Sequence, residues 1–327
     1  MDAQPRPTAD PTQPRPAPRV VVGVDGSTGS LTALRWAMHW ALVRGAEIAV
    51  VAAYPTVPYW TEAQLTDVGP LDAVHDDTWA RARAAVDEIR AGDIDVRDVP
   101  VSLHVEPGTA AAQLVRHSEK ADLLVVGSRG RNLVRSALLG SVALHCVSAA
   151  ECPVVVVPAP GRWSEPGPDS RVVVGIDGSR RSLAAVSAAM TEAGPAGSVT
   201  VVRAQAVTDL WSDQYIVIAP SQQQRQEDAL RNLETLVGEV LVATTGDHPA
   251  VSRLALPGPA GPVLVEQATD ADLLVVASRG LGEFRGLVLG SVALHCVVHA
   301  PCPVLVARPA ARPLPERSAL AGSAASA

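Results

Sequence analysis

A pattern of glycine and serine residues that follows a short apolar run has the clearest chemical meaning in this sequence. Gly127 and Gly130 are followed, after nine further residues, by Gly140-Ser141. Glycine is needed where the backbone must come very close to a ligand, and clustered backbone N–H groups can bind an anion. Gly140-Ser141 lies where a helical pattern begins, and the first N–H groups and the dipole of a helix favour phosphate. The spacing therefore predicts a phosphate-binding loop.

The pattern occurs twice because most of the chain is duplicated. The segment RVVVGVDGS at residues 19–27 returns as RVVVGIDGS at residues 171–179, and LGSVALHCV is identical at residues 139–147 and 289–297. Agreement over two separate segments does not arise by chance. We therefore infer two copies of one domain in tandem.

The second copy departs from the glycine pattern at its first position. Ala277 replaces the glycine there, whereas Gly280, Gly290 and Ser291 match the first copy. If the position requires a positive φ, alanine costs about 1 kcal/mol; if it only has to be small, alanine is tolerated. We expect weaker anion binding in the second copy.

Length and composition exclude several classes of protein. The 327 residues suit two domains of about 150 residues each, and a hydrophobic fraction of 47% is enough to build their cores. The net charge of −7 and an aromatic content of 3% argue against nucleic-acid binding. No apolar run is long enough for a membrane helix, and residues 1–18 have no apolar core of a secretory signal. We expect a cytoplasmic protein.

Each copy alternates apolar strands with helical patterns. In the first copy we expect strands at residues 19–24, 47–53, 100–105, 122–126 and 154–157, and helices at about residues 27–44, 71–90 and 108–120 and from residue 141. This alternation predicts an α/β fold of two tandem, doubly wound, five-stranded parallel sheets, in which ligands bind beyond the carboxyl ends of the strands. The first helix should bury Leu31, Leu34, Met38 and Leu42.

Composition also indicates the domain boundaries. We expect domains at residues 19–158 and 171–308, and a linker rich in proline and glycine at residues 159–170. Residues 1–18 and 309–327 have the composition of disordered tails.

These motifs resemble those of the universal stress proteins. The resemblance covers nearly all of residues 19–158 and 171–308. It depends on the VGVDGS strand end, on the G-x2-G-x9-G-S pattern and on the Cys-Pro pairs at residues 152–153 and 302–303. In that family, members with the glycine pattern bind ATP, and each domain is a Rossmann-like sheet of strand order 3-2-1-4-5. The resemblance thus implies an ATP-binding, nucleotide-dependent regulator in a stress response.

The resemblance also implies which residues hold the nucleotide. The matching positions in the first copy are Asp25, near the base and sugar, and the phosphate-binding Gly127, Gly130, Gly140 and Ser141. Those in the second copy are Asp177, Gly280, Gly290 and Ser291. The neighbouring Arg129, Val142 and Val292 complete the candidate set. Another role for Asp25 is to coordinate a Mg²⁺ ion that accompanies ATP, because carboxylates are common ligands of this ion.

Two other functions stay open. A slow ATPase or nucleotidyl transferase would need a positioned nucleophile and usually a base, and the sequence near the glycine pattern offers no obvious base other than Asp25. We therefore assign no catalytic residue. The third alternative is a nucleotide-free scaffold. In every case we expect the copies to pack as a pseudo-dimer through their apolar fifth strands, at residues 154–157 and 304–307. The protein partner is not indicated, and a homodimer of the whole chain is open.

Cysteines recur next to or near histidines at matching positions of both copies, which raises the question of a metal or redox site. The four cysteines are Cys146, Cys152, Cys296 and Cys302. Each lies on an apolar helix or at the entry to an apolar strand, so we expect small buried hydrophobic residues and assign no metal ligand.

Overall fold

The computed structural model describes residues 17–54, 69–130, 139–161, 163–179, 182–205, 222–243, 246–278 and 289–308. The predicted tails lie outside this part of the chain, apart from residues 17 and 18. The elements of the first copy are β1 (Arg19–Gly23), α1 (Thr28–Arg44), β2 (Glu47–Tyr54), α2 (Gly69–Gly92), β3 (Val101–Pro107), α3 (Ala110–Ser118), β4 (Leu123–Gly127), α4 (Ser141–Ala149) and β5 (Val154–Val157).

The second copy repeats this order of strands and helices. Its elements are β6 (Arg171–Gly175), α5 (Leu183–Ala193), β7 (Ser198–Gln205), α6 (Gln222–Ala243), β8 (Ala250–Pro257), α7 (Ala260–Gln267), β9 (Leu273–Ala277), α8 (Ser291–His299) and β10 (Val304–Ala307). None of the described helices is long and apolar enough to cross a membrane.

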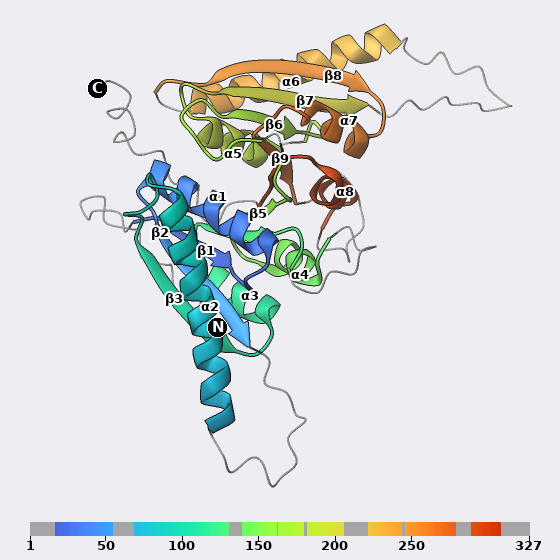
Figure 1. Cartoon of the computed structure of the whole chain (residues 1–327). Coiled ribbons are helices and arrows are strands. Elements are labelled where there is room, and N and C mark those ends of the chain that lie inside the picture. Colours follow the sequence, from blue (N-terminus) through green and yellow to red (C-terminus); the bar gives the residue numbers. More distant parts are fainter. Residues whose placement is uncertain are drawn as a thin grey trace, which may run out of the picture.

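The strands form one continuous ten-stranded sheet in the order β3-β2-β1-β4-β5-β10-β9-β6-β7-β8 (Figure 1). Within each copy the pairing is parallel, as the duplicated α/β pattern predicts, and the order is 3-2-1-4-5, as the family resemblance implies. The two halves join where β5 pairs with β10 in the antiparallel direction. The expected contact between the fifth strands is therefore present, and it covers two apolar edges that would otherwise be open.

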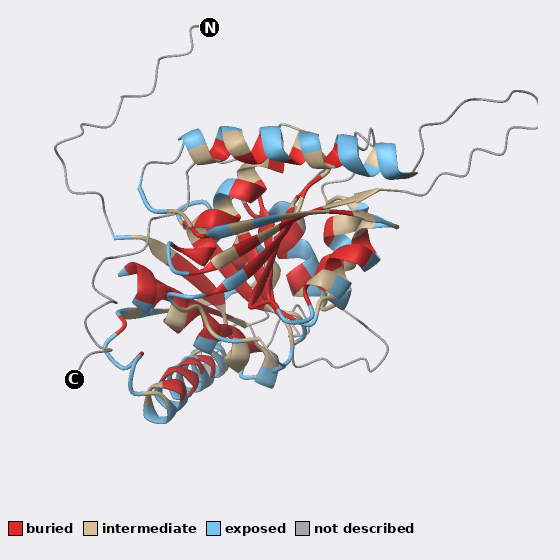
Figure 2. Cartoon of the chain, turned by 90° about the horizontal axis from the view of Figure 1, so that it is seen from above, coloured by how far each residue is buried: buried red, intermediate tan, exposed pale blue. Residues whose placement is uncertain are grey.

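Valine-rich strands are buried on both faces, which is why they have no polar alternation. Val20, Val21 and Val22 of β1 are all fully buried, and so is every residue of β5 to within 1%. Figure 2 shows buried strands in the interior and helices with buried inner and exposed outer faces. The core thus consists of two apolar layers, one on each side of the sheet.

Helix α1 begins as predicted and buries Leu34 and Met38 as expected, with Leu31 packed against the same core, but it does not bury Leu42. Ser27 caps the helix and accepts a hydrogen bond from Ser30 N–H at 3.2 Å. Leu42 was expected in the core and is 42% exposed, so that prediction is wrong; Trp36 and Trp40 are fully buried instead. The reason is that α1 packs against the second copy as well as against its own sheet.

The contact between the copies has an approximate two-fold axis. Val155 pairs with Leu305, and these two residues occupy the same position in their copies. Trp40 and Glu192 are another matching pair, since each lies fifteen residues after the aspartate of its DGS segment. Trp40 Nε1 donates to both carboxylate oxygens of Glu192 at 3.1 Å. Equivalent positions thus meet each other across the axis, as in a symmetric dimer.

Candidate functional site

The structure brings the predicted site residues of the first copy to one edge of the sheet. Strand β1 pairs with β4, Val22 being opposite Val125, so the chain leaves both strands at neighbouring points. Asp25 lies just after β1, and Gly127 is the last residue of β4. Helices α1 and α4 both begin beyond these strand ends. This is the switch point of a doubly wound sheet, where such folds bind their ligands.

Asp25 is held by the turn that starts α1. Gly26 adopts a left-handed conformation with φ of 80°, which turns the chain sharply after the strand. Ser27 then donates to Asp25 Oδ1 from its backbone N–H at 2.9 Å and from its hydroxyl at 2.6 Å. One carboxylate oxygen is therefore fixed by the helix cap.

The glycines allow the loop after β4 to pack against the first turn of α1. A methyl group on Gly127 would lie 2.6 Å from the carbonyl oxygen of Gly29, and one on Gly29 would lie 2.3 Å from that of Arg129. A methyl group on Gly130 would lie 2.8 Å from Asp25 Oδ2. Side chains at these positions would separate the loop from Asp25.

This packing also decides between the two explanations for the first motif glycine. Gly127 is not among the described glycines with a positive φ. The requirement at this position is therefore small size next to the backbone of Gly29, and the positive-φ explanation is wrong. Gly29 itself was missed by the motif analysis.

Helix α4 begins at the far end of the same loop. Gly140 is its N-cap, and Gly140 N–H donates to Ser128 O at 2.8 Å. No side chain of the described residues caps this helix, whereas Ser27 caps α1 and Thr109 caps α3. The first N–H groups of α4, which include those of Ser141 and Val142, therefore have no side-chain acceptor among the described residues, and the helix dipole adds partial positive charge. Such a helix start can bind an anion.

The second copy keeps the helix start and the backbone hydrogen bond of the aspartate turn. Gly290 caps α8 as Gly140 caps α4, its N–H donates to Ser278 O at 2.8 Å, and Ser291 and Val292 form the first turn. Asp177 Oδ1 accepts Ser179 N–H at 2.9 Å. Gly280 lies outside the described residues.

The first helix of the second copy begins later. The segment DGSTGS of the first copy corresponds to DGSRRS, so Arg181 takes the place of Gly29. Helix α1 starts at Thr28, but α5 starts at Leu183, which matches Leu31. Both glycines of the contact are thus replaced in the second copy: Ala277 matches Gly127, and Arg181 matches Gly29.

An arginine lies beside the second aspartate turn. The Arg203 guanidinium donates to Asn232 Oδ1 at 2.9 Å, and a methyl group on Gly178 would lie 2.9 Å from Arg203 Cζ. The matching residue of the first copy is Ala52, and a methyl group on Gly26 would meet no described atom within 4 Å. Within the described part of the chain, the space beside Gly26 is therefore open and that beside Gly178 is filled. A direct comparison of the repeats at Ala52 and Arg203 would have revealed this difference.

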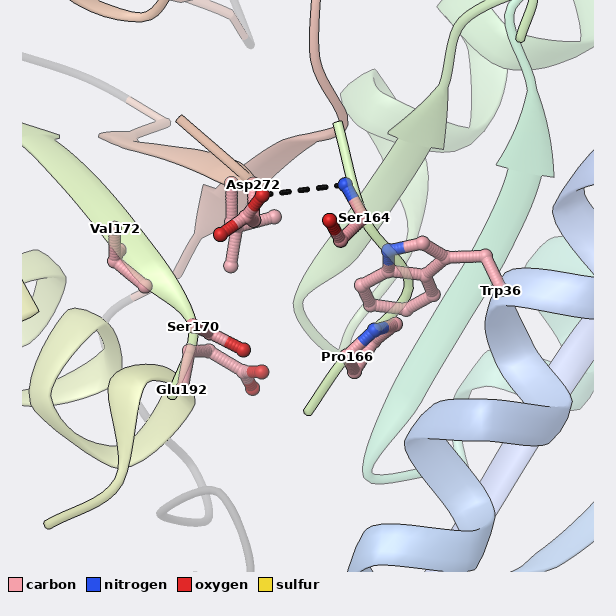
Figure 3. Close-up of a pocket in the computed structure, with 8 residues that line it drawn as sticks. Trp36, Ser164, Pro166, Ser170, Val172, Glu192 and Asp272 are labelled. Atoms are coloured by element: carbon pink, nitrogen blue, oxygen red, sulfur yellow. Dashed lines mark hydrogen bonds between the residues drawn. The ribbon is translucent and has the colours of Figure 1, made fainter. Parts of the chain in front are cut away.

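Two other features lie away from this site. The small pocket in Figure 3 is at the junction of the copies, where Ser164 N–H donates to Asp272 at 3.2 Å, and none of the predicted site residues lines it. All four cysteines are buried free thiols, and burial raises the pKa of each to about 12. The prediction that they act as buried hydrophobic residues is confirmed.

The fold and the two strand-end loops define a duplicated, Rossmann-like α/β protein. The universal stress protein family matches the chain twice, at residues 17–158 and 170–308. The chain belongs to this family, with two of its domains in tandem.

Relatives of similar length support this assignment. The chain is 32% identical over 308 residues to the universal stress protein Rv1996 of Mycobacterium tuberculosis, over 88% of this chain and 94% of the relative. It is also 32% identical over 314 residues to Rv2005c of the same organism, over 91% and 99% of the two chains. The crystal structure of a universal stress protein from Archaeoglobus fulgidus has the same fold, with a TM-score of 0.59, 17% identity and coverage of 89% and 96%.

Proposed function

We propose that the first copy binds ATP and that the protein is a nucleotide-dependent regulator in a stress response. The observation that carries this proposal is the close packing of Gly130 on the carboxylate of Asp25, on a loop that leads to the start of α4, where no described side chain caps the helix. One site then combines two features. Its carboxylate is suited to accept hydrogen bonds from hydroxyl groups of the sugar or amino groups of the base, and its helix start is suited to bind phosphate.

The described residues fit the two ends of a nucleotide. The N–H groups of Ser141 and Val142 and the Ser141 hydroxyl would hold phosphate, and the exposed Arg129 adds a positive charge next to the loop. Asp25 would contact the ribose or base. If Mg²⁺ accompanies the nucleotide, Asp25 is the carboxylate that could coordinate it instead.

Binding is favoured over hydrolysis at this site. Asp25 is the carboxylate beside Gly130, and its Oδ1 already accepts two hydrogen bonds from Ser27. A group fixed in this way orients a ligand well but is a poor base for activating a water molecule. Occupancy of the loop by ATP, rather than turnover, would then alter the surface that a partner protein contacts.

Matched substitutions in the two copies test the proposal. Asp25→Asn and Asp177→Asn make the same chemical change at equivalent positions of the full chain. We expect Asp25→Asn to weaken ATP binding at least about tenfold and Asp177→Asn to leave it nearly unchanged, as measured by equilibrium dialysis. Nucleotide released on denaturing the wild-type protein should approach one ATP per chain.

Other outcomes would contradict parts of the proposal. Two ATP molecules per chain, with equal losses in both variants, would show that the copies are equivalent. Steady phosphate release over many turnovers would favour the enzyme. If no nucleotide copurifies and none binds on titration, the proposal is wrong and the scaffold alternative is left.

A further inference from the structure

Two histidines and a glutamate converge at the outer edge of the first copy. His104 and Glu106 lie on β3, and His117 lies on α3. One ligand atom from each of these three residues lies within 4.8 Å of the other two. Within the described part of the chain, this is the one group of three such side chains that could share a metal ion.

The fold explains why the three side chains meet. Residues two apart on a strand point to the same face, so His104 and Glu106 project from β3 together. Helix α3 covers that face and places His117 Nε2 3.4 Å from Glu106 Oε1, with the two imidazole rings 5.0 Å apart. Strand β3 is the outermost strand of the sheet, which leaves one side of the group without a neighbouring strand.

We propose that His104, Glu106 and His117 bind a divalent transition metal ion such as Zn²⁺. Two imidazole nitrogens and one carboxylate oxygen are a common ligand set for zinc, and a fourth position would be left for water. The Ser102 hydroxyl lies 3.2 Å from His104 Nε2 and orients that ring, as outer groups do around ligating histidines. The cysteines cannot compete for the ion, because all four are buried.

The protonation states suit a cation. Burial, followed by the charges of His117 and Arg19, lowers the pKa of His104. Burial also lowers the pKa of His117, although the hydrogen bond to Glu106 opposes this shift. Both shifts favour the neutral imidazole, which is the form that binds metal.

Arg116, a positive group in direct contact with Glu106, opposes metal binding and provides a test. Arg116 Nη2 lies 2.9 Å from Glu106 Oε1, but its side chain is 55% exposed. An ion pair at such an exposed site is weak, so the arginine can turn into solvent when an ion replaces it. Removing Arg116 should therefore strengthen metal binding.

The second copy lacks the whole group. Its residues at the positions of His104, Glu106 and His117 are Leu254, Leu256 and Gln267. Leu254 and Leu256 pack on the apolar layer instead. The duplicated fold does not need these three polar residues, so their convergence in the first copy is not a requirement of folding.

The experiment is a titration of the metal-stripped full chain, produced without a histidine tag, with Zn²⁺ alone. We expect one site per chain by calorimetry, and Co²⁺ should give the visible absorption of a low-symmetry site with nitrogen ligands. His104→Leu and His117→Gln, which copy the second domain, should weaken binding about 100-fold or more. Arg116→Gln should tighten it severalfold.

His299→Gln is the control, because it breaks up the stacked pair of His295 and His299, whose rings are 4.3 Å apart on α8. It should leave zinc binding unchanged. Asp25→Asn should also leave zinc binding unchanged, and this result would show that zinc and the nucleotide bind at different sites. Circular dichroism checks that each variant is folded. No zinc binding by the wild-type chain would overturn the proposal. So would binding that survives in both His104→Leu and His117→Gln, or binding that His299→Gln abolishes.

Discussion

Helices α4 and α8 begin in nearly identical ways, yet the residues at the carboxyl ends of β4 and β9 and at the starts of α1 and α5 differ between the copies. In the first copy Gly127 and Gly29 bring the loop and α1 into backbone contact. In the second, Ala277 and Arg181 occupy these positions and α5 starts at the residue matching Leu31. The close backbone contact needs a glycine at both positions. Once one of the two has been replaced, the other is no longer required for this contact. Duplication has allowed one site to change while the helix start that it shares with the other site is retained.

The same divergence occurs at the contact between the copies. Trp40 and Glu192 occupy equivalent positions and meet across the pseudo-two-fold axis. Arg44 Nη2 lies 2.8 Å from Glu192 Oε2, and the guanidinium stacks on the Trp40 ring at 4.3 Å. Two first copies would place tryptophan against tryptophan, and two second copies would bury two carboxylates together. The contact therefore favours pairing of unlike copies.

The largest expected effect comes from removing Arg44. The side chains of Arg44 and Glu192 are 0% and 3% exposed, so Arg44→Met would leave a buried carboxylate without its cation. We expect the free energy of unfolding to fall by about 3–5 kcal/mol, measured by denaturant titration.

A double variant distinguishes the charge from the lost packing. Arg44→Met with Glu192→Gln removes both charges and keeps an amide oxygen that can accept from Trp40. Most of the lost stability should return. If the single variant loses less than about 1 kcal/mol, the ion pair does not stabilise the contact.

The next effect concerns the paired glycines. Gly127→Ala would place a methyl group 2.6 Å from Gly29 O, and the backbone has to shift to accept it. We expect a loss of about 1–3 kcal/mol in unfolding free energy, together with weaker ATP binding. Calorimetric unfolding and ATP titration of the same preparation measure both.

Ala277→Gly is the matched reverse change in the second copy. It should cost less than about 1 kcal/mol, and it should not create an ATP site, because Arg181 and the late start of α5 remain. A Gly127→Ala protein as stable as Ala277→Gly would show that the close approach to Gly29 is unimportant. A gain of ATP binding in Ala277→Gly would show that this alanine alone accounts for the difference in ATP binding between the copies.

The sequence predicted what repeats and periodicity encode. The duplicated segments indicated two domains, and the apolar runs indicated parallel strands. The burial of Leu42 was predicted wrongly. Helical periodicity identifies the apolar face that packs on the helix's own sheet, but it cannot show that α1 also packs against the second copy. Gly29 and Arg203 become meaningful only when aligned with Arg181 and Ala52. His104, Glu106 and His117 lie on two elements, so no local motif joins them.

The last prediction concerns Asp272, which ties the start of β6 to β9. Asp272 accepts from Arg171 N–H at 2.9 Å, as Asp122 accepts from Arg19 N–H in the first copy. In the second copy the Arg171 side chain adds bonds at 2.9 Å and 3.1 Å. Burial alone would raise the pKa of Asp272, but these hydrogen bonds outweigh it and hold the pKa below its ordinary value.

The direction of this shift determines the pH dependence. Because the folded state binds this proton more weakly than the unfolded chain does, the stabilisation is complete above the ordinary carboxyl pKa and is lost as the pH falls through the lowered value. Asp272→Asn should therefore cost about 1.5 kcal/mol at pH 7, and the difference from wild type should shrink below about pH 4. Arg171→Met should cost less, since that side chain is 53% exposed and its ion pair is screened by solvent. A difference between Asp272→Asn and wild type that stays constant from neutral to acidic pH would show that the charge of Asp272 does not stabilise the fold.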